Sequence, residues 1–252
     1  MRVVLTRPAH EAHRWREALT ARGFQVQLLP LIAIEPLPTS PQIDAARQAL
    51  ARCGAAMFVS ANAVQHFLGA EVRWPATTRA WATGAGTASA LQAAGVPVDL
   101  IDRPAADAHQ FDSETLWVQV AGQVGPGSRV LIVRGAGADG QPGGRDWLAR
   151  RLSDEGAIVE IVAAYRRVLP SWTDHERAVA QGAAHDGSVW VFSSSEAIGN
   201  LRALLPSTSW ASARAVATHE RIAQAAREAG FGVVSPSRPT EDAVAAVLES
   251  FR

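Results

Sequence analysis

The chain has 252 residues, with 24 Lys+Arg balanced by 24 Asp+Glu, 48% hydrophobic residues and 19% charged residues. This composition predicts a chain that buries a large core, and it excludes a disordered protein and a general phosphate-backbone binder with a basic excess. Every cationic residue of this count is arginine, which excludes chemistry that needs a lysine amine and a P-loop that needs its lysine.

Cysteine content and apolar runs predict the cellular setting. The single cysteine, Cys53, excludes an internal disulfide and a thiolate-based metal site. The apolar runs are far shorter than the roughly 20 residues of a transmembrane helix, and residues 1–8 lack a signal-peptide core. We therefore expect a cytoplasmic protein in which Cys53 is a small core residue, in a helix before a strand.

Short β-branched runs alternate along the chain with Ala-, Leu- and Arg-rich segments of helical period. In chain order, the sequence predicts strands at 2–6, 25–29, 55–59, 79–82, 96–101, 129–133, 157–162, 188–192, 214–217 and 232–234. Helices are predicted over 11–21, 43–52 and 241–251. Such alternation is typical of parallel sheets with helices on both faces. The predicted fold class is therefore α/β and doubly wound.

A weak internal duplication indicates two similar domains. Residues 6–26 (Thr-Arg, then Trp, Leu, Gly and Val) are echoed by residues 133–159 (Val-Arg, then Trp, Leu, Gly and Val). A second echo pairs FVSANAV at 58–64 with VFSSSEAI at 191–198. Because the copies interleave, the simplest account is one domain inserted into the other.

The predicted domains follow from this interleaving. Residues 1–34 with 168–252 would form the discontinuous first domain, and residues 37–164 would form the inserted second domain. Strand-like linkers near 31–36 and 163–169 would connect them. Two linkers allow a hinge, so the cleft between the domains is the expected ligand site.

Polar strand-to-helix turns supply candidate ligand contacts. In open parallel sheets, ligands bind beyond the carboxyl ends of the strands, where helix N-termini offer N–H groups to anions. The candidates from these turns are Arg7, Ser60, Asn62, Thr87, Ser193, Ser194, His219 and Arg221. Since Ser, Thr and Asn are also the best N-caps, each turn has an alternative interpretation as a helix cap.

A glycine-rich segment at 125–144 predicts a loop. Glycines allow the backbone to approach a ligand closely, and Arg134 and Arg145 could grip carboxylates there. A surface loop with solvated arginines explains the same pattern equally well.

Other motifs give weaker indications. Gly84 and Gly86 resemble part of a dinucleotide loop, but Ser89 stands where the fingerprint needs its third glycine. His10 and His13 share a helix face without a third ligand nearby, which indicates a solvated face rather than a metal site. We expect neither a cofactor nor a metal.

Tyr165 is the only tyrosine of the chain and lies in the second predicted crossing between the domains. A phenol at the floor of a cleft can donate a proton or polarise a leaving oxygen. The alternative is an amphipathic aromatic residue half-buried in a linker.

An ordered set of short segments spans nearly the whole chain: VLTRP at 4–8, LPLIAIEP at 29–36, FVSANAV at 58–64, GTA at 86–88, VLIVRG at 130–135, GRDWL at 144–148, VAAYRR at 162–167 and FSS at 192–194. This set resembles the uroporphyrinogen-III synthase family. The resemblance implies two similar α/β domains, one inserted into the other and joined by a two-stranded linker, without cofactor or metal.

The resemblance also implies a reaction, in which the linear tetrapyrrole hydroxymethylbilane closes to uroporphyrinogen III. The last pyrrole ring is inverted through a spiro-pyrrolenine intermediate and water is lost. Tyr165 matches the linker tyrosine of the family and is assigned to help the hydroxyl leave. Thr87 matches a substrate-contacting threonine, whereas His219 and Arg221 stand where many members have a second one.

The expected ligand of a family member is a polycarboxylate. We expect a monomer that also contacts, transiently, the enzyme that makes hydroxymethylbilane, and no nucleic-acid or membrane partner. Two alternatives stay open: a non-catalytic two-domain hinge protein that binds a small anion, and a Rossmann-like nucleotide enzyme.

Overall fold

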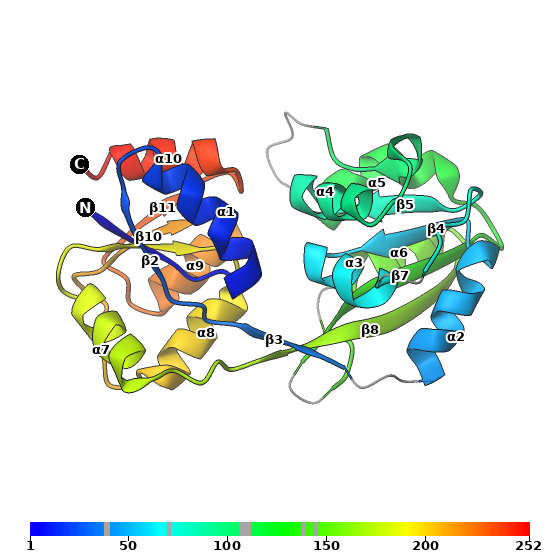
Figure 1. Cartoon of the computed structure of the whole chain (residues 1–252). Helices are drawn as coiled ribbons and strands as arrows, with labels where there is room; N and C mark the ends of the chain where they lie inside the picture. Colours follow the sequence, from blue (N-terminus) through cyan, green and yellow to red (C-terminus); the bar gives the residue numbers. More distant parts are fainter. Residues whose placement is uncertain (38–40, 70–71, 106–111, 138–139, 144–145) are drawn as a thin grey trace. The chain divides into compact units, whose positions relative to one another are not determined.

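The computed structural model describes residues 1–37, 41–69, 72–105, 112–137, 140–143 and 146–252 (Figure 1). The chain divides into two compact units. Unit 1 consists of Met1–Ala33 and Val168–Arg252, and unit 2 consists of Ile34–Arg167. The chain therefore leaves unit 1 within strand β3 (Ala33–Pro36) and returns at the end of strand β8 (Ile158–Val168).

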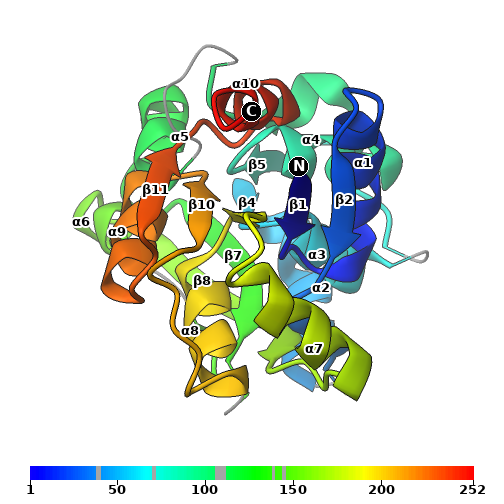
Figure 2. The same cartoon turned by 90° about the vertical axis from the view of Figure 1, so that its left-hand side faces the viewer.

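Unit 1 contains a five-stranded sheet in the order β11-β10-β9-β1-β2, with every neighbouring pair parallel. Figure 2 shows β10 and β11 on one side of β1 and β2 on the other. The strands are β1 (Arg2–Leu5), β2 (Gln25–Leu28), β9 (Val189–Phe192), β10 (Arg214–Ala217) and β11 (Val233–Pro236). The helices are α1 (Ala9–Thr20), α7 (Asp174–Ala183), α8 (Ser195–Leu204), α9 (Glu220–Glu228) and α10 (Glu241–Glu249).

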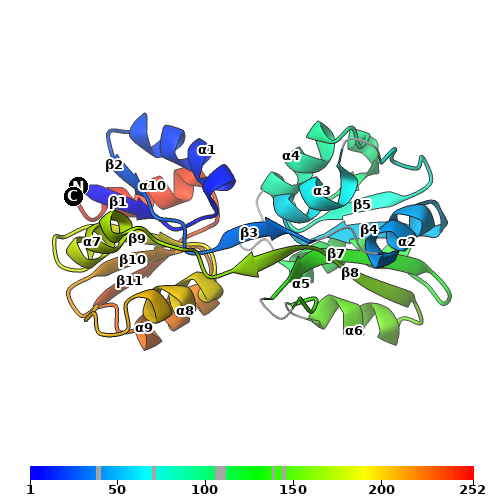
Figure 3. The ribbon, with the colours of Figure 1, turned by 60° about the horizontal axis from the view of Figure 1, so that its bottom comes forward.

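The central strand of unit 1, β9, is buried along its whole length because helices cover both faces of the sheet. Figure 3 shows α1 and α10 on one face and α8 and α9 on the other. Val189 and Val191 pack with buried residues of α1 and α10. Trp190 and Phe192 alternate with them, and their rings lie 6.4 Å and 5.3 Å from that of Phe231.

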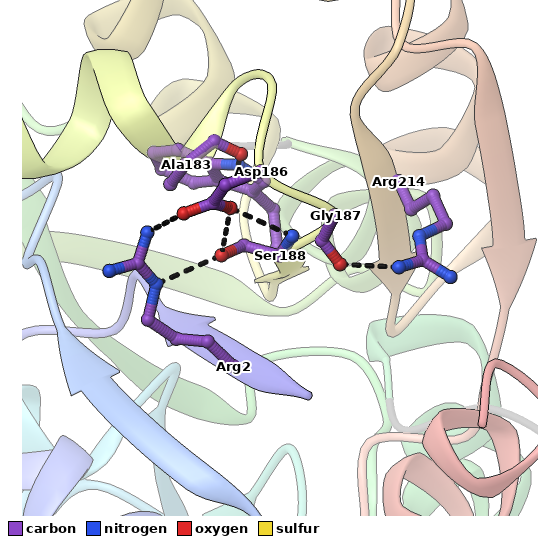
Figure 4. Close-up of polar contacts among 7 residues, drawn as sticks. Arg2, Ala183, Asp186, Gly187, Ser188 and Arg214 are labelled. Carbon is purple, nitrogen blue, oxygen red and sulfur yellow. Dashed lines mark hydrogen bonds and ion pairs between the residues drawn. The ribbon is translucent and has the colours of Figure 1, made fainter.

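A polar network closes the amino edge of the unit 1 sheet (Figure 4). Arg2 donates from Nε to Ser188 Oγ at 2.9 Å and pairs with Asp186. Asp186 Oδ1 accepts from the Ser188 amide at 3.0 Å and from its hydroxyl at 2.6 Å. Arg214, at the start of β10, donates to the Gly187 carbonyl. These bonds tie β1 and β10 to the turn before β9, at the edge opposite the polar turns that end the strands.

Unit 2 contains a six-stranded sheet in the order β3-β8-β7-β4-β5-β6, in which the pairs from β8 to β6 are parallel. Its other strands are β4 (Ala55–Phe58), β5 (Arg79–Ala82), β6 (Ile101–Asp102) and β7 (Arg129–Ala136). Its α-helices are α2 (Pro41–Ala49), α3 (Ala61–Leu68), α4 (Ala85–Ala93), α5 (Ser113–Val120) and α6 (Trp147–Asp154). Short 3-10 helices lie at η1 (Leu50–Arg52), η2 (Val98–Leu100) and η3 (Ala121–Gln123).

Strand β4 divides the core of unit 2 into two apolar clusters. Ala56 and Phe58 pack with residues of α2, α3 and α4, whereas Ala55 and Met57 pack with residues of α5 and α6. Figure 3 shows the same separation of these helices. The period of two along a buried strand produces both layers. The predicted α/β class with doubly wound parallel sheets is confirmed.

Cys53 follows η1 and is 8% exposed in the first of these clusters. The predicted core position is therefore confirmed, although the expected helix over 43–52 is divided between α2 and η1. Burial also raises the pKa of the Cys53 thiol.

The structure corrects the strand predicted over 96–101. Val98–Leu100 is the 3-10 helix η2, and only Ile101–Asp102 joins the sheet. Pro97 precedes the helix with φ −57° and without an N–H for a sheet. Its carbonyl instead accepts from the Leu100 amide at 3.0 Å.

A second correction concerns Arg134, which was assigned to the glycine-rich loop. Strand β7 continues to Ala136 because residues 134–136 keep pairing with β8, past a register shift between Arg134 and Gly135. In the described ranges of the chain, we find no helix long and apolar enough to cross a membrane.

Candidate active site

The carboxyl ends of β4, β5, β7 and β8 lie at one edge of the unit 2 sheet, since these strands are parallel. This edge, the carboxyl edge of unit 2, carries five of the predicted site residues: Ser60, Asn62, Thr87, Arg134 and Tyr165. The turns after β4 and β5 are tied together by a hydrogen bond from Thr83 Oγ1 to the Val59 carbonyl at 3.1 Å. Arg145 lies outside the described residues.

Tyr165 and Ser60 are in direct contact at this edge. Tyr165 lies on β8 and is 3% exposed. Its Oη is 3.0 Å from Ser60 Oγ, and either hydroxyl can donate in this hydrogen bond. Ser60 is also the N-cap of α3, where its Oγ accepts from the Ala63 amide at 3.2 Å. The cap interpretation of Ser60 is thus confirmed, and the same oxygen reaches the phenol.

The ring of Tyr165 lies against the backbone of the neighbouring strand. Gly135 pairs with Tyr165 across β7 and β8, just after the register shift. A Cβ at Gly135 would come within 2.6 Å of Tyr165 Cζ and 2.7 Å of its Cε2. His66, on α3, places its ring centroid 5.7 Å from that of Tyr165 at an interplanar angle of 31°. Gly135 and His66 therefore belong to the surroundings of the phenol, although neither was among the predicted site residues.

Asn62 and Thr87 are both buried near the amino-terminal ends of helices. Asn62 is the second residue of α3 and is 3% exposed, while Thr87 is the third residue of α4 and is 6% exposed. The N-cap of α4 is Gly84, which makes no side-chain cap. The first N–H groups of α4 and the Thr87 hydroxyl are therefore the groups that this helix end can offer to a ligand.

Arg134 is held by the protein itself. It is 8% exposed, its Nη1 donates to Asp146 at 2.8 Å, and its Nη2 donates to the Pro142 carbonyl at 3.0 Å. The hydrogen bond from Arg134 lowers the pKa of the Asp146 carboxyl. A ligand carboxylate would have to share Arg134 with these two partners.

The described part of the glycine-rich segment is fastened to the end of β7. Gly143 donates its amide to the Gly135 carbonyl at 3.0 Å, and Gly137 donates to Gln141 at 3.0 Å. Ala136 forms an antiparallel bridge with Pro142. These contacts fix the backbone beside Tyr165.

The second set of predicted residues lies at the carboxyl edge of unit 1, after β1, β9 and β10. Ser194 caps α8 by accepting from the Glu196 amide at 3.2 Å, and Ser193 precedes it, directly after β9. His219 caps α9 through Nδ1, which accepts from the Arg221 amide at 3.0 Å. The side chain of Arg221 is exposed. Two of these four residues therefore have the capping role that the sequence left as the alternative.

Arg7 follows β1 at the same edge of unit 1. Its guanidinium stacks 4.2 Å from the ring centroid of Trp15 and pairs with Glu11 at 3.3 Å. Burial lowers the pKa of Arg7, and Glu11 partly offsets this effect. Cation–π stacking and the ion pair give Arg7 a role in packing α1 against the sheet.

Among the described residues, no three His, Cys, Asp or Glu side chains form a group that could hold a metal ion. The chemistry of both edges comes from hydroxyl groups, one phenol, arginines and helix amides. Such groups suit an anionic ligand with several acceptor oxygens.

Known proteins with similar sequences identify the family of this chain. A family model described as Uroporphyrinogen-III synthase HemD matches residues 13–246. A uroporphyrinogen-III synthase from Synechococcus elongatus is 29% identical over 213 residues, which cover 81% of this chain and 75% of that protein.

Two solved structures show the same fold. Uroporphyrinogen-III synthetase from Helicobacter pylori matches with a TM-score of 0.61 and 17% identity, covering 100% of both chains. A mutant uroporphyrinogen III synthase from Thermus thermophilus matches with a TM-score of 0.55 and 19% identity, covering 100% of this chain and 97% of that chain. At these identities the structures show a likeness of fold alone.

The two parallel sheets, each with polar helix ends at its carboxyl edge, define a two-domain α/β protein of the open-sheet class. The family model spans residues 13–246 and therefore identifies the family within this class. The chain belongs to the uroporphyrinogen-III synthase family, which makes it a lyase-type enzyme of heme biosynthesis. The resemblance found in the sequence is confirmed.

Proposed function

We propose that the protein converts hydroxymethylbilane to uroporphyrinogen III, with inversion of the last pyrrole ring and loss of water through a spiro-pyrrolenine. The observation that carries this proposal is the Tyr165–Ser60 pair, with oxygens 3.0 Å apart, in a chain of this family. A phenol next to a hydroxyl at the carboxyl edge of a parallel sheet suits proton donation to a leaving oxygen.

In this proposal the predicted residues at the carboxyl edge of each unit are contacts for carboxylates of the substrate, which carries eight of them. Asn62, Thr87, Arg134 and Arg145 of unit 2 would bind carboxylates of the substrate, and so would Arg7, Ser193, Ser194, His219 and Arg221 of unit 1. Ser60, also predicted from the sequence, lies beside Tyr165. The N-termini of α3, α4, α8 and α9 support this role, because their first amides carry a partial positive charge toward an anion.

Tyr165 would begin the reaction by donating its phenol proton to the terminal hydroxyl. The carbon–oxygen bond breaks, water leaves, and an azafulvene cation remains. The substituted α-carbon of the last pyrrole then forms the new carbon–carbon bond, and the spiro intermediate fragments and recloses with that ring inverted. The proton released when the pyrrole regains aromaticity balances the one that Tyr165 donates. Positioning the chain ends supplies much of the rate gain.

The test is an isomer assay. Hydroxymethylbilane is generated enzymatically, incubated with the protein and oxidised, and the porphyrin isomers are separated. A synthase yields mostly the type III isomer, whereas the bilane without an enzyme closes to type I. Type I product alone would disprove the proposed function and leave the non-catalytic anion-binding protein as the better interpretation.

A further inference from the structure

We propose that Ser60 and Gly135 are positioning residues for Tyr165: Ser60 donates its hydroxyl proton to Tyr165 Oη, and the bare backbone of Gly135 lets the ring lie where it receives this bond. The inference rests on the proposed role of Tyr165 and explains how the phenol keeps its own proton directed at the substrate.

The cap at Ser60 leaves its hydroxyl proton free to donate to Tyr165. Ser60 Oγ already accepts from the Ala63 amide at 3.2 Å. The hydroxyl retains one proton to donate, and Tyr165 Oη lies 3.0 Å away. The resulting chain runs from the Ala63 amide through Ser60 to Tyr165. Each donor in such a chain polarises the next, so the phenol becomes a stronger donor.

The amino-terminal end of α3 adds to this effect. Its amides carry a partial positive charge, and Ser60 connects this charge to the phenol oxygen. A negative charge that grows on Tyr165 Oη during proton donation is therefore stabilised. A cap alone would satisfy α3 without any contact with Tyr165.

Gly135 sets the position of the ring from the other side. A Cβ there would lie 2.6 Å from Tyr165 Cζ and 2.8 Å from Arg167 Nη1, both well inside van der Waals contact. Tyr165 is 3% exposed, so its ring has little room to move away. An alanine at this position would displace the ring and lengthen the 3.0 Å bond to Ser60.

Double-mutant cycles with Tyr165→Phe test the proposal. Glycine is an acceptable N-cap without a hydroxyl, so Ser60→Gly removes the donor and leaves α3 capped. We expect Ser60→Gly to lower kcat by roughly 3–10-fold with little change in KM, as the loss of one hydrogen bond predicts. In the Tyr165→Phe background the same substitution should cause no further loss. Ser60→Thr, which keeps the hydroxyl, should restore the rate.

Gly135→Ala should lower kcat to a similar extent as Ser60→Gly in the wild-type protein, and it should cause no further loss in the Tyr165→Phe protein. Gly122→Ala is the matched control, because a Cβ at Gly122 meets nothing within 4 Å. Should Gly135→Ala fail to fold, the Ser60 cycle decides alone. Additive losses with Tyr165→Phe, or a raised KM at unchanged kcat, would show direct substrate binding by Ser60 and overturn the proposal.

A spectroscopic measurement tests the contact without relying on activity. Because Tyr165 is the only tyrosine, fluorotyrosine incorporation gives one fluorine resonance. Ser60→Gly and Gly135→Ala should shift it, while Gly122→Ala should leave it in place. An unshifted resonance would overturn the positioning role.

The isomer assay separates failure of this inference from failure of the proposed function. If the type III isomer forms normally in Tyr165→Phe, this inference fails and the proposed function survives. If the wild-type protein forms no type III isomer, the proposed function itself is overturned.

Discussion

At the residue scale, Arg7 and Arg134 have similar surroundings, and those of Arg221 differ from both. Arg7 and Arg134 each follow a buried run of a parallel strand, and each is held by a carboxylate of its own unit, Glu11 and Asp146. Arg221 is exposed at the carboxyl edge of unit 1 and forms no ion pair with any described residue. Arg221 is therefore the more accessible cation for a polycarboxylate.

Replacing Tyr165 with phenylalanine tests the acid role directly. We expect Tyr165→Phe to reduce turnover by roughly 10–100-fold, at or below the usual contribution of a general acid. The ring packing stays and the hydrogen bond to Ser60 is lost, so the free energy of unfolding should fall by only about 1 kcal/mol. Steady-state formation of the type III isomer is the measurement, and unchanged turnover would remove Tyr165 from the mechanism.

The Arg134–Asp146 pair predicts a pH effect on the stability of unit 2. Since the pKa of Asp146 lies below its ordinary value of 3.8 when folded, the pair contributes stability above pH 3.8. That contribution is lost as the pH falls from 3.8 through the lower folded value. Because Asp146 is half exposed, we expect a small effect. Urea unfolding should show that Asp146→Asn flattens this acid-side loss. Parallel losses in both proteins would contradict the assignment.

At the scale of elements, helix caps decide which polar turns remain open to a ligand. Ser60, Ser194 and His219 each accept an amide of the helix that follows. Gly84, before α4, offers no side-chain acceptor. Among these four helix ends, the first turn of α4, which contains Thr87, is thus the one whose amides depend most on water or ligand.

The imidazole cap of α9 gives a prediction on stability. His219→Ala should lower the free energy of unfolding by about 1 kcal/mol, because it removes the acceptor of the Arg221 amide. His219→Ser should retain most of the stability. Urea denaturation of both variants provides the measurement. Equal stability of the alanine and serine variants would show that the cap contributes nothing, leaving a ligand contact as the role of His219.

Strand existence could be predicted from the sequence more readily than strand pairing. β4 and β9 were predicted because continuous apolar runs identify buried parallel strands. The contact of Gly135 with Tyr165 could not be predicted, since it depends on a register shift between Arg134 and Gly135. Pro97 was a usable signal against the wrong strand at 96–101. The candidates Ser60 and Tyr165 were named separately, and only the fold shows them 3.0 Å apart.

At the scale of the whole molecule, unit 2 is continuous in sequence and unit 1 is not. Both apolar clusters of unit 2 are formed by residues of unit 2 itself. We therefore expect residues 34–167, expressed alone, to unfold cooperatively in urea and to protect Cys53 from thiol reagents. Residues 168–252 alone lack β1 and β2 and should not fold. A fragment 34–167 without a cooperative transition would contradict this prediction.

The position of β1 in its sheet has a consequence for synthesis on the ribosome. β1 ends at Leu5, yet it lies between β2 and β9, and β9 begins only at Val189. During synthesis, β1 can pair with β2 but has no partner on its other side until β9 has left the ribosome. All residues of unit 2 leave the ribosome before β9 does. Exposed strands of this kind are prone to aggregate, so we expect the segment of β1 and β2 to be prone to aggregation until β9 has been synthesised.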